Sequence, residues 1–321
     1  MGDAISRTSR VMAAGISVPT RRLTPWLGVL GVALPLVAGP VAAEVRGAQG
    51  VRSLGTTVNA VRDGRCSSGA CDISGGSRFG PNLFHRFEAF DTRGGITGVR
   101  IQSEGARNVM VGVLNVAGTY LDQPVSLSTK GNLFWLSPGG IQIRGAGGFH
   151  NVQHLQLSTA TALKFGSGVW DALNSTVEQS ALLLDDPIRG GEGLLTDPAA
   201  LQELGLQSNG DLSLDGGSLT VDESLLLDSQ GGNVLLQAMG LQAPGGAMAL
   251  RGRSITLDAS ILDVSSSTGL GGSVLLQGDS LNLFHSRIDA SGWSGGGQIG
   301  LDGRHASRAA AHAAVNGPSG R

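Results

Sequence analysis

The sequence predicts an all-β fold: a right-handed parallel β-helix, or β-solenoid, with an amino-terminal cap and short extra-helical excursions. Three observations predict it. The chain contains an internal repeat of about 25 residues, a period typical of stacked solenoids rather than closed globular cores. Within each copy the apolar residues alternate. The composition is rich in glycine and poor in aromatic residues.

The repeat is clearest where residues 245–265 align with residues 271–291 without a gap. Both segments open with a Gly-Gly pair. The equivalent positions further along are Ser260 and Ser286, Asp263 and Asp289, and Ser265 and Ser291. A third copy starts at Gly296, and a partial copy starts at Gly231. We therefore expect successive copies to stack as rungs of one solenoid.

Alternation of the apolar residues identifies the repeats as strands. Val274 and Leu276 form one alternating pair, Leu281 and Leu283 form a second, and Ile288 begins a third stretch. Period two is the signature of a strand, and Gly, Ser, Asn and Asp separate the stretches. Three short strands per repeat, each ended by a turn, describe one rung of a parallel β-helix. A leucine-rich repeat would need an Asn or Cys ladder that the sequence lacks.

Composition supports a solenoid and excludes some functions. Glycine makes up 52 of 321 residues, against a usual share of about 7%. Frequent tight turns favour glycine because it tolerates positive φ. The net charge is −2, and Lys130 and Lys164 are the only lysines, so a nucleic-acid partner is not expected. Calcium-binding glycine nonapeptides and a phosphate-binding loop are absent from the sequence, and we expect no metal and no cofactor.

The amino terminus, residues 1–43, has the pattern of a secretory signal peptide. Its basic region contains Arg7, Arg10, Arg21 and Arg22, and an apolar run follows at residues 26–38. Small residues then predict cleavage between Ala43 and Glu44. The thirteen-residue run is too short to span a bilayer, so a retained membrane anchor is the weaker interpretation. The two adjacent arginines are also compatible with a twin-arginine signal, although general secretion is favoured.

Cys66 and Cys71 are the only cysteines, with four residues between them. This spacing can close a small disulfide loop in an oxidising compartment, and we favour that pairing over two free thiols. A zinc site would need two further ligands, which the neighbouring sequence does not offer.

Two separate motifs carry the most specific signal in the chain. The first comprises Asn82, Leu83, Phe84, His85 and Phe87, and the second comprises Asn132, Leu133, Phe134, Pro138, Gly140 and Ile141. In this order, behind a signal peptide, they resemble the amino-terminal secretion domain of the filamentous-haemagglutinin and haemolysin family of two-partner secretion exoproteins. Arg86 stands where that family usually has Ser, and Ser137 stands where it has Asn. The resemblance covers roughly residues 50–170.

The resemblance implies a chain exported by an outer-membrane barrel transporter with periplasmic POTRA modules. The product would be secreted or held at the surface of a Gram-negative-type bacterium, with a host or bacterial surface ligand as a further partner. The motif residues would be recognised while the chain is extended, by strand addition to a module. After folding, their aromatic rings would cover the first rungs and the open end of the helix. No catalysis is expected.

The sequence also predicts how the rest of the chain is divided. Residues 44–170 form the secretion domain, with the cap and the first rungs. Residues 171–210 form an excursion that contains a short helix at residues 197–205, which has an Asp cap, Pro at its first position and Gly after its end. Residues 211–303 hold the regular repeats. Residues 304–321 are expected to be a disordered tail.

Two other functions remain as alternatives. A β-helix polysaccharide-degrading enzyme would need carboxylates that converge in a groove, whereas Asp263 and Asp289 are expected to stack as an outward ladder. A G-x-S-x-G match at residues 292–296 lies in a repeat turn and is not expected to be a nucleophile. His150 and His154 are expected to form a surface pair rather than a metal site. The other alternative is a complete short surface adhesin.

Overall fold

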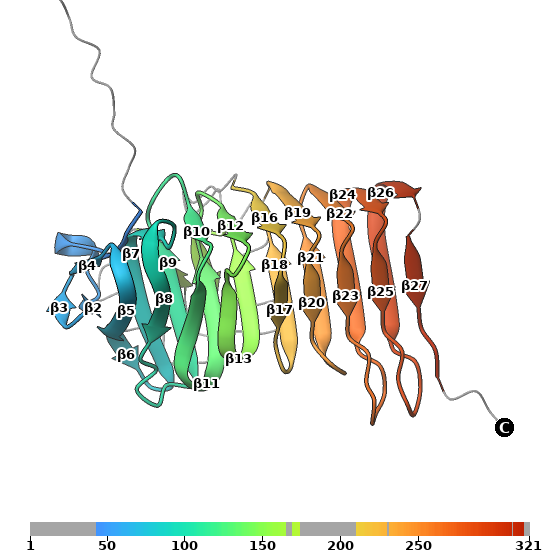
Figure 1. The fold of residues 1–321 in the computed structure, drawn as a ribbon, viewed down its shortest axis with the longest axis horizontal. Helices are drawn as coiled ribbons and strands as arrows, with labels where there is room; N and C mark the ends of the chain where they lie inside the picture. Colours follow the sequence, from blue (N-terminus) through green and yellow to red (C-terminus); the bar gives the residue numbers. More distant parts are fainter. Residues whose placement is uncertain (1–42, 165–168, 174–209, 230, 310, 318–321) are drawn as a thin grey trace, which may run out of the picture. The chain divides into compact units, whose positions relative to one another are not determined.

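The computed structural model describes residues 43–164, 169–173, 210–229, 231–309 and 311–317. These residues form a parallel β-helix of about eight turns, so the predicted fold class is confirmed (Figure 1). The described part of the chain contains no α-helix, and its one helical segment is the 3-10 turn η1 (Gly50–Arg52). The short helix expected at residues 197–205 lies outside the described residues.

The strands stack in three walls, and each full rung contributes one strand segment to each wall. Wall 1 consists of β5 (Ser68–Gly75), β8 (Gly95–Ile101), the first residues of β11 (Pro124–Leu136) and β13 (Gly148–Ser158), and then β17 (Ser218–Thr220), β20 (Gly240–Gln242), β23 (Ile261–Asp263), β25 (Arg287–Asp289) and β27 (His312–Ala314). The last five of these strands form a separate hydrogen-bonded sheet, which continues the wall because β17 packs against β13.

Wall 2 consists of the first half of β7 (Asn82–Asp91), β9 (Asn108–Val113), the later parts of β11 and β13, β18 (Ser224–Asp228), β21 (Ala247–Arg251), and the first halves of β24 (Ser273–Phe284) and β26 (Gln298–Ala309). Wall 3 consists of the end of β7, β10 (Thr119–Leu121), β12 (Ile141–Arg144), β16 (Leu212–Asp215), β19 (Asn233–Gln237), β22 (Ser254–Asp258), and the second halves of β24 and β26.

Register along the walls follows the sequence repeat. Ala247 pairs with Ser273 and Asp263 pairs with Asp289, the same partners that the gap-free alignment matches. Inward side chains therefore stack on their equivalents: Leu227, Leu250 and Leu276 form one fully buried column in wall 2. Such columns join into a single core that runs the length of the helix. Burial of this apolar surface is the main stabilising term.

Short antiparallel strands cap the amino-terminal end. They are β1 (Val45–Gly47), β2 (Thr56–Val58), β3 (Val61–Arg62), β4 (Arg65–Cys66) and β6 (Ser77–Phe79). β2 pairs with β5, while β1 and β6 pair with β7, so the cap is hydrogen-bonded to the first rung. Val45, Val58 and Cys66 extend the core into the cap. The cap thus closes an end that would otherwise expose apolar surface and free strand edges.

The chain leaves the helix after β13. The antiparallel hairpin of β14 (Ala162–Lys164) and β15 (Val169–Asp171) belongs to none of the three walls. β12 pairs directly with β16, and β13 pairs directly with β18, so the rungs on the two sides of the excursion are adjacent. The excursion therefore begins earlier than the expected boundary at residue 171. The two short strands of this hairpin carry apolar residues as the rungs do, so their apolar content alone does not distinguish a hairpin from a rung.

The expected tail at residues 304–321 is also corrected. β26 continues to Ala309 and pairs with β24 along its whole length, and β27 pairs with β25. Ala306 lies opposite Leu281, and Ala313 lies opposite Ile288. Backbone pairing continues although Arg308 stands opposite the buried Leu283, which is why the loss of leucine alternation did not end the helix. Residues 318–321 lie outside the described part.

Candidate functional site

The Asn-Leu-Phe starts of the two predicted motifs occupy equivalent positions of wall 2. The first motif lies on β7, and Asn132, Leu133 and Phe134 of the second lie on β11, with β9 between them. Asn82 pairs in register with Asn108, and Asn108 pairs with Asn132. The same register places Val109 between the two motif leucines and Met110 between the two motif phenylalanines. The motifs are therefore one structural feature that recurs two rungs apart.

A ladder of buried amides joins the starts of these strands. Asn108 Nδ2 donates to Asn82 Oδ1 at 2.8 Å, and Asn132 Nδ2 donates to Asn108 Oδ1 at 2.7 Å. The next two rungs place His154 and then Ser224 at the same level, and His154 Nδ1 is hydrogen-bonded to Ser224 Oγ. All three asparagines are buried. Because unmade bonds at buried amides are costly, the ladder favours one register over its alternatives.

Inward aromatic rings fill the first rungs. The ring centroids of Phe87 and Phe90 are 5.0 Å apart, and those of Phe90 and Trp135 are 4.6 Å apart. Trp135 in turn lies 5.5 Å from Phe149. All these contacts are edge-to-face, the arrangement that aromatic quadrupoles favour. The rings connect β7, β11 and β13, and so tie three rungs together.

Outward aromatic rings form a second cluster that solvent does not reach. Phe84 and Phe134 point away from the main core, yet both are fully buried. The β14–β15 hairpin covers them: the Phe84 and Trp170 rings lie 5.2 Å apart, and Leu163 belongs to the same cluster. From the cap side, the Phe79 ring lies 5.9 Å from that of Phe84. The outward residues of both motifs are thus bound to the excursion.

Arg86, which follows His85 in the first motif, connects that motif to the same hairpin. Its Nη2 donates to Asp171 O at 3.0 Å, and its Nη1 donates to Arg52 O at 2.9 Å. Its guanidinium carbon lies 6.0 Å from the centroid of the Trp170 ring. Burial lowers the pKa of Arg86 to about 10, with Asp171 opposing and Arg52 adding to the shift, so the side chain stays charged at neutral pH. A serine side chain at position 86 would be too short to reach Asp171 O and Arg52 O.

His85 lies within the core between Leu83 and Phe87. Burial lowers its pKa to about 4, so the ring is neutral at physiological pH. Its Nδ1 lies 3.4 Å from Thr56 Oγ1, and that hydroxyl oxygen accepts a hydrogen bond from Arg86 N. Which of these two groups donates to the other depends on the ring tautomer. The second ring nitrogen, Nε2, has no hydrogen-bond partner among the described residues.

A tight turn ends the second motif. Gly140 N donates to Ser137 O at 2.9 Å, with Pro138 at the second position of the turn. Ser137 Oγ donates to Gly140 O at 2.8 Å and accepts from Thr119 Oγ1 at 3.0 Å. The serine therefore bonds within its turn and to the preceding rung. Gly140 has a φ of +107°, which only glycine adopts readily.

Stacking of this turn also constrains its neighbours. A Cβ added to Gly139 would lie 2.5 Å from Gly118 N, in the equivalent turn of the preceding rung. The chain then enters β12 with Ile141, which is fully buried. Glycine here lets successive turns approach closely enough for strand pairing on both sides.

The remaining predicted residues lie in the cap. Cys66 and Cys71 are joined by a disulfide with a Cα–Cα distance of 5.8 Å, which links β4 to β5. Ala43 and Glu44 are the first described residues, directly before β1. Glu44 O accepts from Asp91 N, and its carboxylate forms an ion pair with Arg46. Cleavage between Ala43 and Glu44 stays a prediction.

The expectation of a surface histidine pair is wrong. His150 is exposed, whereas His154 is buried in the amide ladder. Leu155 beside it faces the main core, so His154 faces outward, and its ring lies 5.3 Å from that of the outward Phe134. Alternation predicts the direction of a side chain but not what packs over it. The sequence analysis did not place Asn108 or His154 in this ladder. The only sequence signal for either residue is that it lies one rung after an Asn that begins a strand.

Acidic residues at equivalent positions of successive rungs accept backbone hydrogen bonds in the turns. Asp263 Oδ1 accepts from Ser265 N, and Asp289 Oδ1 accepts from Ser291 N, each at 2.9 Å. Their register pairing agrees with the predicted ladder.

Among the described residues, no group of three or more His, Cys, Asp or Glu side chains is placed to hold a metal ion. Within the same residues, no helix has the length and apolar character needed to cross a membrane.

No protein-family model matches the chain, and no curated protein matches it.

Proposed function

We propose that this chain is the secretion-targeting module of a two-partner secretion exoprotein of the adhesin or haemagglutinin type. A signal peptide directs it to the periplasm. There, the POTRA modules of an outer-membrane barrel transporter bind the extended chain through the two motifs. The chain crosses the outer membrane and folds into its β-helix outside the cell, where it is released or stays at the surface and meets a host or bacterial ligand.

One observation carries the proposal: the two motifs are the same element of wall 2, repeated two rungs apart at the capped end. Asn82 and Asn132 begin the strands, and Phe84 and Phe134 are the outward rings. In the folded protein all four are buried and out of a partner's reach. A transporter can therefore bind these residues only before the chain folds, when each motif is an extended segment suited to strand addition.

The fold suits release on the far side of a membrane. Each rung contacts its neighbours in sequence, so rungs can form one after another as the chain emerges. The cap and the aromatic core of the first rungs provide a closed end on which later rungs add. This order of folding needs no nucleotide site on the chain.

The test is co-expression with the candidate barrel transporter, followed by measurement of the protein in the medium and in the periplasm. Phe84→Ala and Asn132→Ala are expected to accumulate in the periplasm. Leu276→Ala serves as the matched control, because it truncates a fully buried side chain far from the motifs and costs about 2–5 kcal/mol, comparable to Phe84→Ala. Equal export of all three variants would show that the motifs act in stability alone.

A binding measurement separates recognition from folding. Chain unfolded in urea is diluted onto immobilised POTRA modules, and the bound amount is measured before refolding. Wild type and Leu276→Ala are expected to bind equally, and Phe84→Ala to bind less. No binding of the unfolded wild-type chain would overturn the proposal.

A further inference from the structure

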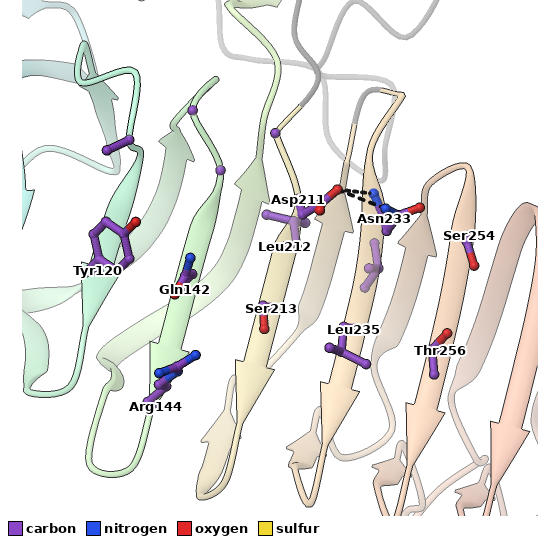
Figure 2. A pocket seen from close by; sticks show the side chains of 15 residues that line it. Tyr120, Gln142, Arg144, Asp211, Leu212, Ser213, Asn233, Leu235, Ser254 and Thr256 are labelled. Atoms are coloured by element: carbon purple, nitrogen blue, oxygen red, sulfur yellow. Dashed lines mark hydrogen bonds between the residues drawn. The ribbon is translucent and has the colours of Figure 1, made fainter.

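A groove of about 750 Å³ lies on the outer face of wall 3 (Figure 2). The neighbouring strands β10, β12, β16, β19 and β22 each contribute one outward side chain at the same level of register. These side chains are Tyr120, Gln142, Ser213, Leu235 and Thr256. They form a row that crosses the strands and so follows the stacking axis of the β-helix.

Polar side chains border this row on both sides. Asn233 and Ser254 line the groove near the turns, and Asp211 Oδ1 accepts from Asn233 N at 2.7 Å and from Asn233 Nδ2 at 3.1 Å. Arg144 projects on the other side of the row (Figure 2). Asp211 and Arg144 carry opposite charges, and the other described lining residues are neutral. The groove therefore has no net formal charge.

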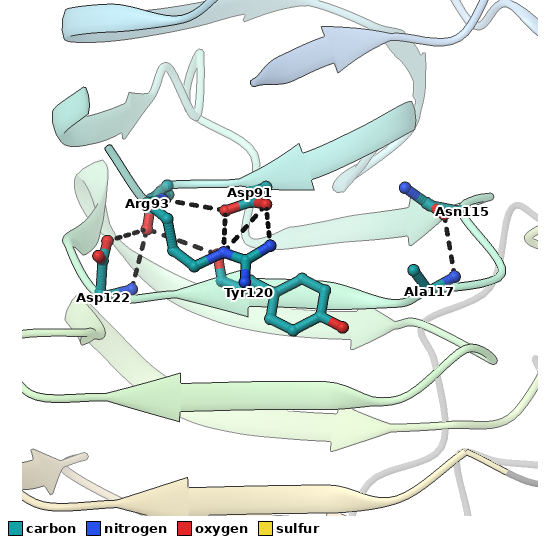
Figure 3. Close-up of polar contacts among 7 residues, drawn as sticks. Asp91, Arg93, Asn115, Ala117, Tyr120 and Asp122 are labelled. Carbon is teal, nitrogen blue, oxygen red and sulfur yellow. Dashed lines mark hydrogen bonds and ion pairs between the residues drawn. The ribbon is translucent and has the colours of Figure 1, made fainter. Parts of the chain in front are cut away.

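Tyr120 forms a fixed platform at one end of the groove. The Arg93 guanidinium carbon lies 4.0 Å from the centroid of its ring (Figure 3). Asp91 holds Arg93 through Nε at 2.9 and 3.1 Å and through Nη2 at 2.6 Å, and these hydrogen bonds raise the pKa of Arg93. Thr92 links Tyr120 to Asp122, because its Oγ1 donates to Tyr120 O at 3.5 Å and accepts from Asp122 N at 3.0 Å. The tyrosine ring is thus oriented before any ligand binds.

The strands beneath the groove constrain what can bind. β12, β16, β19 and β22 are each paired on both sides, so a ligand here meets side chains and finds no free strand edge. Strand addition by a peptide is therefore excluded at this face. A nucleic acid or another polyanion would need a cluster of cations, whereas Arg144 is offset by Asp211.

We propose that this groove binds a neutral, extended polysaccharide whose sugar rings lie along the row. Amide and hydroxyl side chains both donate and accept hydrogen bonds, as sugar hydroxyls do. Tyr120 and Leu235 offer apolar surface to the C–H faces of the rings. Adjacent strands lie about 4.8 Å apart, so successive sugars can meet successive strands. Gly140 of the second motif also lines the groove, but the proposed sugar contacts are the side chains of the wall 3 row, so failure of this proposal would leave the proposed function intact.

The test is calorimetric titration of the purified full chain with cellohexaose, chitohexaose and laminarihexaose, and with a heparin hexasaccharide as the anionic probe. At least one neutral hexasaccharide is expected to bind, and heparin is not. Leu235→Arg places a charged, bulky side chain in the middle of the row and is expected to weaken binding about tenfold or more. Ile261→Arg is the control, because Ile261 is a similarly exposed aliphatic residue on wall 1 (49%, against 37% for Leu235).

Circular dichroism establishes that both variants are folded before titration. Three results would overturn the proposal: no neutral hexasaccharide binds the wild-type chain, heparin binds in preference, or Leu235→Arg and Ile261→Arg bind equally. Binding that Leu235→Arg weakens and Ile261→Arg leaves unchanged would support it.

Discussion

Asn108 holds the middle of the buried amide ladder, so Asn108→Ala is expected to destabilise the β-helix strongly. The substitution removes the bond to Asn82 Oδ1 at 2.8 Å and the bond from Asn132 Nδ2 at 2.7 Å. Each buried partner then loses one interaction, at a cost of about 1–3 kcal/mol. The expected loss in the free energy of unfolding is therefore about 2–6 kcal/mol.

Urea unfolding followed by circular dichroism measures this loss. Asn282→Ala is the matched control, because Asn282 lies half-buried on the outer face of wall 3 and its two hydrogen bonds are long, at 3.3 and 3.4 Å. The control is expected to lose less than about 1 kcal/mol. If Asn108→Ala costs no more than Asn282→Ala, the ladder does not stabilise the fold and the reasoning fails.

Three other perturbations have definite expected results. Removing the Cys66–Cys71 disulfide by a double serine substitution should cost roughly 2 kcal/mol, because the closed loop is short, and a thermal melt measures it. Burial sets the pKa of His85 near 4 in the folded state against 6.5 in the unfolded state, so the unfolded state binds more protons between these values. Stability should fall by up to about 3 kcal/mol as the pH drops from 6.5 to 4. Arg86→Ser should release the β14–β15 hairpin and speed its cleavage in limited proteolysis.

Each of these has a result that contradicts it. A disulfide variant with an unchanged melting temperature would mean that the Cys66–Cys71 bond does not stabilise the fold by restraining the unfolded chain. For the pH effect, His85→Gln should flatten the profile between pH 4 and 6.5 and His150→Gln, at an exposed position, should not; identical profiles would exclude His85 as the cause. Proteolysis of Arg86→Ser at the wild-type rate would show that the hairpin is held by its apolar contacts alone.

The rung architecture could be predicted because it depends on local pattern. The gap-free match of residues 245–265 to 271–291 gives the same register that the strands adopt, since equivalent residues of successive rungs pair. Alternation predicted which side chains face the core, such as Leu250 and Leu276. Both follow from the two-residue side-chain period of a strand.

Other features could not be predicted because they depend on partners distant in sequence. Asn108 is followed by Val and Met, so nothing local marks it as the link between the two motifs. The burial of Phe84 depends on Trp170, which reaches it from the hairpin 86 residues further along. The rung at residues 305–309 lacks leucine alternation and is maintained by backbone pairing.

The sequence by itself determined the solenoid, its rung length and the inward faces of the repeats, because these arise from periodicity within a few tens of residues. Only the tertiary structure decided that the two motifs are one ladder, that Arg86 and the hairpin cover their outward rings, and that side chains from successive rungs line a groove on wall 3. Those relations exist only once the chain has wound and brought separate turns into contact, and no local pattern encodes which side chain of one turn will meet which of the next.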